Sequence, residues 1–132
     1  MSDAITPTDR ELEILHVLWE RGEASVRDVF ESLSHRLPIV QNTVQAFLRT
    51  MEDKRLVSHR VEGRTFIYRP LVQRERTKRR LVMELMHRAF DGAVDQLVQS
   101  ALSARKPTEE ELQRLETMLS DLRKQSTSRK ES

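Results

Sequence analysis

One stretch, residues 38–54, constrains the fold of this chain more than any other, because its apolar residues recur at helical spacing. At about 100° per residue, one narrow face carries the apolar side chains of Val40, Val44, Phe47, Leu48 and Met51. The opposite face carries Asn42, Gln45, Ala46, Arg49 and Asp53. A stripe of this strength predicts a helix that packs one side onto a core.

The polar face of this helix has an unusual composition for a surface that only meets water. Its amides can bond adenine edges and its Arg can bond guanine, while a small Ala allows close approach to a base pair. Asn42, Gln45 and Arg49 are therefore candidates for base contacts in a DNA major groove. An ordinary amphipathic surface helix explains the stretch equally well, so the rest of the chain must decide.

The charge is unevenly distributed along the sequence. Residues 36–80 hold twelve basic and four acidic residues, a net charge of +8, although the whole chain carries only +2. The preceding residues 1–35 are acidic, at −5, and the following residues 81–132 are nearly balanced, at −1. A concentrated basic region is typical of proteins that bind polyanions, although it can also serve solubility alone.

Two helices are predicted before residues 38–54. Thr8 with Glu11 forms a capping box that starts a helix over residues 9–21, and Gly22 ends it. Ser25 starts a second helix, which we expect to end near Arg36. The proline at position 38 separates that helix from the third, a pattern that matches a helix-turn-helix.

After residue 54 the period of the apolar residues changes to two. Residues 56–61 and 65–69 are rich in β-forming residues and flank Gly63, which suits a tight hairpin turn, and Pro70 ends the second strand. Three helices followed by a basic hairpin is the order of a winged helix. The hairpin arginines Arg60, Arg64 and Arg69 would then lie near phosphates or a minor groove, unless they only keep the strands soluble.

From residue 71 the pattern returns to helix. Asp91 and Gly92 predict a bend, Pro107 a stop, and Thr108 with Glu111 a further capping box. The apolar positions that we expect to form a dimer interface are Leu81, Leu85, Phe90, Leu97, Leu112, Leu115, Leu119 and Leu122. About 50 residues bury too little surface to fold alone. These helices should therefore pair with a second copy, or else fold back on residues 1–70 within a monomer.

The predicted fold class is mainly α: a winged helix-turn-helix over residues 1–70 and a helical dimerisation domain over residues 71–123. Residues 124–132 are polar and are expected to form a disordered tail.

Several function classes find no support in the sequence. The chain has no Cys, no apolar run long enough for a transmembrane helix and no signal-peptide pattern at its start, so we expect a cytoplasmic protein. The four His are scattered without metal-ligand spacing, and no nucleotide-binding or hydrolase motif is present. We therefore expect no metal, no cofactor and no enzymatic activity.

The ordered set of motifs resembles the penicillinase-repressor family over about residues 5–123. The resemblance is carried by residues 6–15, 18–19, 24–29, 42–44, 48 and 63–68. It implies winged-helix repressors that bind inverted repeats as homodimers through a C-terminal helical domain. It also implies that Asn42, Thr43, Gln45 and Ala46 lie on the DNA-facing helix.

The sequence departs from that family at several positions. Val40 stands where relatives often have a polar cap, and Arg55 follows Lys54 where relatives commonly have Gly, so we expect Arg55 to take a strained left-handed backbone. Antibiotic-responsive relatives are cleaved at an Asn–Phe bond, but the nearest positions here are Ser100 and Ala101. The Cys-rich tail of the copper-responsive branch is also missing, so the sequence indicates neither the inducing signal nor a membrane sensor or protease partner.

The sequence thus predicts a DNA-binding transcriptional regulator, most simply a repressor that occupies an inverted-repeat operator as a homodimer. The full set of predicted DNA contacts is Gln41, Asn42, Thr43, Gln45, Ala46, Arg49, Arg60 and Arg64. The alternative is a winged-helix module that binds an acidic protein partner through the basic region and has no operator.

Overall fold

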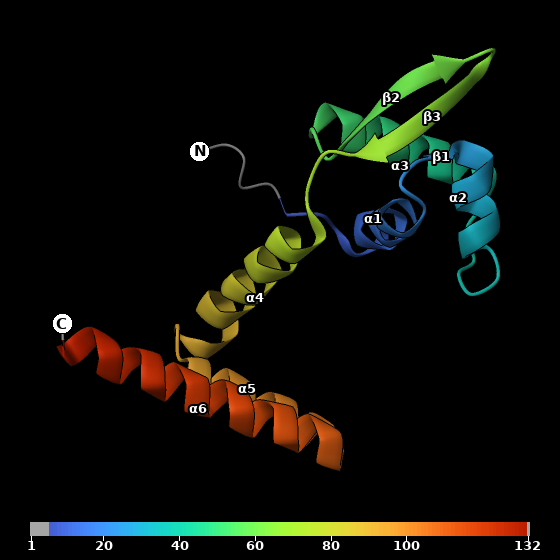
Figure 1. The fold of residues 1–132 in the computed structure, drawn as a ribbon. Coiled ribbons are helices and arrows are strands. Elements are labelled where there is room, and N and C mark those ends of the chain that lie inside the picture. Colours follow the sequence, from blue (N-terminus) through green and yellow to red (C-terminus); the bar gives the residue numbers. More distant parts are fainter. Residues whose placement is uncertain (1–5, 132) are drawn as a thin grey trace. The chain divides into compact units, whose positions relative to one another are not determined.

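A computed structural model describes residues 6–131, with side chains described as far as residue 128. The chain divides into two compact units, residues 1–84 and residues 85–132 (Figure 1). The N-terminal unit contains helices α1 (Asp9–Arg21), α2 (Val26–Leu33) and α3 (Gln41–Asp53), and strands β1 (Ala24–Ser25), β2 (Val57–Glu62) and β3 (Thr65–Pro70). Helix α4 (Arg74–Phe90) crosses the boundary, and α5 (Val94–Ala104) and α6 (Glu109–Glu131) complete the C-terminal unit.

The predicted starts of the first two helices are confirmed. Thr8 caps α1, and Glu11 returns a side-chain bond to the Thr8 backbone N–H, at 2.9 Å. Ser25 caps α2 in the same reciprocal way with Asp28, and the Ser25 backbone N–H lowers the pKa of the Asp28 carboxyl below its ordinary value. Helix α2 is shorter than expected, because it ends at Leu33 rather than near Arg36.

The hairpin also follows the prediction, with strand limits shifted by a residue. Strands β2 and β3 pair antiparallel from Val57 opposite Pro70 to Glu62 opposite Thr65, and the short β1 adds to the other side of β3. Gly63 has φ 67°, which a tight two-residue turn of this kind requires at its first central position. The result is a three-stranded sheet of order β1-β3-β2.

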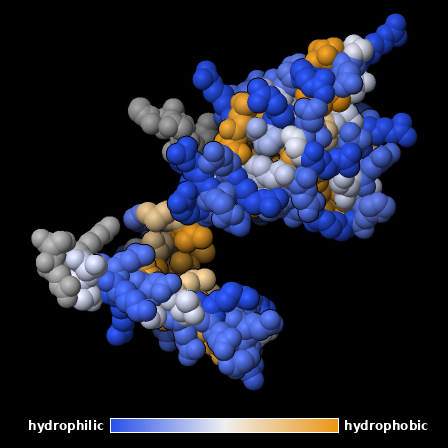
Figure 2. Space-filling view, viewed as in Figure 1, coloured by the Kyte–Doolittle hydropathy of each residue, from blue (hydrophilic) through white to orange (hydrophobic). Residues whose placement is uncertain are grey.

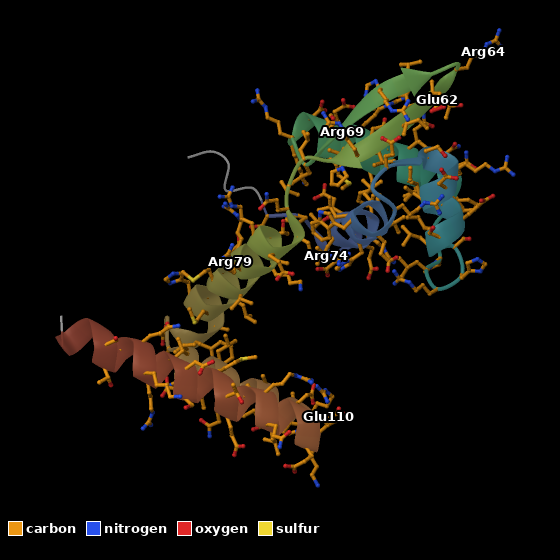
Figure 3. All side chains as sticks on the ribbon, viewed as in Figure 1. Glu62, Arg64, Arg69, Arg74, Arg79 and Glu110 are labelled. Carbon is orange, nitrogen blue, oxygen red and sulfur yellow. The ribbon has the colours of Figure 1, made fainter. Side chains whose placement is uncertain are left out.

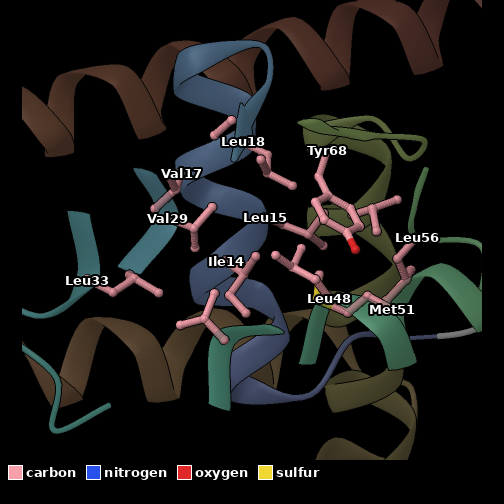
Figure 4. Close-up of a cluster of buried hydrophobic side chains, with 13 residues drawn as sticks. Ile14, Leu15, Val17, Leu18, Val29, Leu33, Leu48, Met51, Leu56 and Tyr68 are labelled. Carbon is pink, nitrogen blue, oxygen red and sulfur yellow. The ribbon is translucent and has the colours of Figure 1, made fainter. Parts of the chain in front are cut away.

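One hydrophobic core holds the three helices against the base of the sheet (Figure 4). Its members come from every element of the N-terminal unit up to β3, and those labelled in Figure 4 include Ile14, Leu18, Val29, Leu33, Leu48, Met51, Leu56 and Tyr68. Burial raises the pKa of the Tyr68 hydroxyl above its ordinary value. This core fixes α3 with its polar face outward.

The N-terminal unit extends further along the chain than the predicted boundary at residue 70. The indole N–H of Trp19 donates to the backbone oxygen of Val72 at 2.9 Å, and Thr77 in α4 is buried. The hydroxyl of Thr6 donates to the carboxylate of Glu84. These contacts attach the first half of α4 to the winged helix, so the compact unit ends at residue 84.

In the C-terminal unit the predicted bend and cap are confirmed. Asp91 and Gly92 both have positive φ, and Thr108 and Glu111 exchange the bonds of a capping box. The predicted disordered tail is corrected, because α6 continues from residue 124 to Glu131. The stretch contains no Gly or Pro, and its Arg, Lys and Gln residues favour helix, so nothing local ends α6 at residue 123.

Candidate nucleic-acid interface

Helix α3 presents the polar face that the sequence predicts. Val44, Leu48 and Met51 are fully buried, whereas all six predicted DNA contacts on the helix are exposed: Gln41, Asn42, Thr43, Gln45, Ala46 and Arg49. The predicted stripe is wrong at its first member, because Val40 is 62% exposed. The helix begins at Gln41, so Val40 is an extended residue before it and supplies no side-chain cap.

The short segment after α3, residues 54–56, is fixed to the core at both of its ends. Lys54 is the C-cap residue of α3, and its Nζ donates a hydrogen bond to Oε2 of the buried Glu11 at 2.8 Å. Arg55 then takes a φ of 67°, which confirms the expected left-handed geometry. Because Leu56 is buried directly afterwards, the chain must turn within this one residue.

A second set of contacts connects α3 to the wing formed by β2 and β3. Nδ1 of His59 in β2 lies 2.8 Å from both carboxylate oxygens of Glu52 in α3. The same imidazole stacks on the ring of Phe66 in β3, with ring centroids 4.2 Å apart and planes 14° apart. These contacts position the wing relative to the exposed polar face of α3.

Of the three hairpin arginines, the two that we predicted as DNA contacts, Arg60 and Arg64, lie in different surroundings. Arg64 lies exposed at the tip of the hairpin (Figure 3). Arg60 forms ion pairs with Glu23 at 2.5 Å and with Glu62 at 3.1 Å. The hydrogen bond from Arg60 lowers the pKa of Glu23 and raises that of the guanidinium. Arg60 must therefore exchange protein carboxylates for phosphates if it binds a nucleic acid.

A groove of about 550 Å³ lies between α3, the start of α2 and the wing. It brings together four of the predicted contacts, Gln41, Gln45, Arg49 and Arg64, but not Asn42, Thr43, Ala46 or Arg60. It also contains Arg27, which is not among the DNA contacts predicted from the sequence. Three guanidinium groups around one groove make it suitable for phosphate oxygens.

Arg27 could have been found from the sequence. It is the second residue of a helix whose start the Ser25 cap fixes, and helix N-termini attract phosphate. Its side chain is 76% exposed and pairs with Glu31 along the same helix at 3.1 Å.

The predicted dimerisation residues all retain contact with solvent in the single chain. Leu81, Phe90, Leu97 and Leu115 are half-buried, while Leu85, Leu112, Leu119 and Leu122 are exposed. Among residues 85–128, whose side chains the structure describes, none is buried. Hydrophobic residues consequently form part of the surface of this unit (Figure 2).

Within residues 6–131, no helix has both the length and the apolar character needed to cross a membrane. The same described part of the chain contains no cluster of three His, Cys, Asp or Glu side chains that would hold a metal ion.

Helices α1, α2 and α3 with the sheet β1-β3-β2 define a winged-helix domain, with α3 in the position of a recognition helix. The chain belongs to the penicillinase repressor family, because the model of that family, described as "Penicillinase repressor", matches residues 7–121. This is a family of transcriptional repressors and not of enzymes.

The chain is also similar to individual proteins and domains. The penicillinase repressor of Bacillus licheniformis is 25% identical over 114 residues, which cover 86% of this chain and 89% of that protein. The DNA-binding domain of the repressor BlaI is 30% identical, covering 51% of this chain and 82% of that one, with a TM-score of 0.47. The monomeric form of B. licheniformis BlaI in complex with the blaP half-operator is 28% identical, covering 55% and 88%, with a TM-score of 0.48.

Proposed function

We propose that the protein represses transcription by binding an inverted-repeat operator as a homodimer, each copy placing α3 in the major groove of one half-site. The observation that carries this proposal is the exposed face of α3, where amides and a guanidinium lie above three fully buried side chains. The net charge of +8 over residues 36–80 supports a polyanionic partner.

The contacts divide by chemistry. Asn42, Gln45 and Arg49 have side chains that can read base edges, and Ala46 leaves room for the helix to approach. Gln41, Thr43 and the groove residue Arg27 would bind phosphates and set the register of the helix on the duplex. The phosphate contacts from the wing are Arg60 and Arg64.

Base reading by α3 is tested with Gln45→Ala in gel shifts on DNA from upstream of the protein's own gene and on random DNA of equal length. A bidentate contact to a base contributes roughly 1–3 kcal/mol of discrimination. Its loss should therefore lower the affinity for the upstream DNA about 5- to 150-fold. Affinity for random DNA should change less than about twofold. Gln113→Ala, on α6, is the matched control and should leave both affinities unchanged.

Equal losses on the two DNAs would reject the base-reading role of Gln45. Failure of a confirmed dimer to bind any inverted repeat at low salt would instead support the protein-interaction module.

We also propose that the C-terminal units of two copies form the dimer interface. A unit with no buried residue cannot be stable in water by itself, since folding depends on removing apolar surface from solvent. Exposed residues of all three helices offer that surface, for example Leu85 at 49%, Val94 at 60% and Leu119 at 61%. Two half-sites would also double the number of base pairs that the protein reads.

The dimer is tested by sedimentation of the double variant Leu115→Asp/Leu119→Asp. Charges in a buried interface should give monomers with weak operator binding, whereas Gln113→Asp on the opposite face of α6 should remain dimeric. A wild-type chain that sediments as a monomer at micromolar concentration would overturn the proposal.

The proposal includes no proteolytic release and no membrane sensor. Ser100 and Ala101, where cleaved relatives have Asn–Phe, are exposed residues inside α5. An adjacent gene for a membrane metalloprotease, together with cleavage of this chain by its product, would overturn this part.

A further inference from the structure

A second cavity, of about 600 Å³, lies in the N-terminal unit at the start of α4. Its apolar lining comes from Pro7, Leu56, Leu71 and Val72. Pro7 and Leu56 are buried, whereas Leu71 remains 46% exposed. The volume lies within the range of small-molecule sites, about 300–1,000 Å³.

The polar lining of this cavity consists of two neutral residues, Gln73 and Thr77, and two basic ones, Arg76 and Arg80. Arg76 and Arg80 lie four residues apart on α4, and therefore on one face of the helix. No lining residue is acidic, and neither arginine forms an ion pair within the described part of the chain. The nearby carboxylate of Glu84 accepts a hydrogen bond from Thr6. Each of these guanidinium groups, unpaired among residues 6–128, offers a fork of N–H donors that matches a carboxylate.

We propose that this cavity binds a small molecule with one carboxylate and an apolar body, and that its occupant regulates DNA binding. The carboxylate meets Arg76 and Arg80, and the body covers Leu56 and Leu71. A DNA phosphate satisfies the charge but not the apolar lining, since burying apolar surface requires an apolar ligand. The regulatory part of the inference rests on the proposed function.

The cavity is connected to the recognition helix by backbone contacts. Leu56 follows the left-handed Arg55 that ends the α3 segment, and its carbonyl accepts the backbone N–H of Leu71 at 2.9 Å. A ligand against Leu56 and Leu71 therefore touches the residues that hold the C-terminal end of α3.

The protein contains a reporter for this cavity. Trp19 is the only Trp, and its indole N–H bonds to the carbonyl of the lining residue Val72. Its resonance is a single indole cross-peak in a ¹H–¹⁵N spectrum of the full chain. Occupation of the cavity must change the surroundings of this bond and shift that peak.

The test titrates the full chain with 4-phenylbutyrate, without DNA, and follows the Trp19 indole peak. We expect a saturable shift that 4-phenyl-1-butanol, which lacks the charge, and acetate, which lacks the body, do not reproduce. Arg76→Gln/Arg80→Gln should weaken binding about tenfold, because hydrogen bonds to charged groups are lost. Arg79 also lies on α4 but does not line the cavity (Figure 3). The control variant Arg79→Gln should therefore change the affinity for 4-phenylbutyrate less than about twofold.

An unshifted peak, equal binding of the alcohol, or an unchanged affinity of the double variant would overturn the site. Since no DNA is present, this titration succeeds or fails independently of the proposed operator binding. In a separate gel shift, 4-phenylbutyrate should change operator affinity of the wild type but not of Arg76→Gln/Arg80→Gln. Equal operator affinity with the cavity saturated would overturn the regulatory role.

Discussion

Replacing Lys54 with methionine should destabilise the N-terminal unit by about 2–3 kcal/mol, although methionine retains most of the apolar stem. The substitution removes the ammonium group that lies 2.8 Å from the carboxylate of Glu11, whose side chain is 2% exposed. Glu11 would then be a buried anion whose remaining bond comes from the Thr8 backbone N–H. An uncompensated buried charge is among the largest causes of destabilisation by a single substitution.

The magnitude follows from the burial of the two partners. Breaking a fully buried ion pair by removing one side costs about 3–5 kcal/mol. Here the side chain of Lys54 is 31% exposed, so water can partly solvate the carboxylate once the ammonium is gone. We therefore take a value below that range. The exposed pair Lys78–Glu75, at 3.0 Å, should contribute no more than about 1 kcal/mol.

The assay is urea denaturation at fixed protein concentration, followed by the fluorescence of Trp19, which lies in the N-terminal unit. Lys78→Met is the matched control and should leave the midpoint nearly unchanged. The double variant Glu11→Gln/Lys54→Met should recover most of the loss. A Gln at position 11 removes the charge, while its amide oxygen can still accept from the Thr8 N–H, so the capping box remains.

The reasoning would be refuted if Lys54→Met and Lys78→Met cost the same free energy. It would also be refuted if Glu11→Gln did not rescue Lys54→Met. The effects of the two substitutions on the free energy of unfolding would then simply add, as they do for residues that do not interact.

Two further predictions concern a backbone position and a carboxyl group. Arg55→Gly should raise the free energy of unfolding by about 1 kcal/mol, since Gly adopts φ 67° without steric cost; a lower urea midpoint would contradict this. Hydrogen bonding to Arg105, with help from the Thr108 backbone, lowers the pKa of Glu111 from 4.5 to about 2. The stabilisation from this depressed pKa is complete above about pH 4.5 and is lost as the pH falls toward 2. NMR titration of the Glu111 carboxyl should show the low midpoint, and Glu111→Gln should remove this pH dependence from the α6 cap; a midpoint near 4.5 would contradict it.

The parts of the fold that the sequence could predict are those that local chemistry specifies. The capping residues Thr8, Ser25 and Thr108 start their helices where expected, and Gly63 turns the hairpin. The exposed face of α3 follows from the periodicity of Val44 and its partners in the core.

The sequence predictions were wrong or incomplete where tertiary contacts or weak local signals determine the structure. Val40 fits the helical stripe but lies before the first turn, which a wheel plot cannot show. The unit boundary depends on the bonds of Trp19 and Thr6, which join residues 53 and 78 positions apart. The Ser25 cap indicates that Arg27 lies at a helix N-terminus, but its position beside Gln45 and Arg64 depends on the packing of α2, α3 and the wing.

The absence of buried residues between positions 85 and 128 has a consequence for gene dosage. In the proposed homodimer the C-terminal unit is stable only when two chains meet, so folding of this part depends on protein concentration. When most chains are unpaired, the number of dimers varies with the square of the chain number. Dilution of the chains by half during cell growth would then reduce the dimers about fourfold, and promoter activity would respond sharply to a modest change in synthesis.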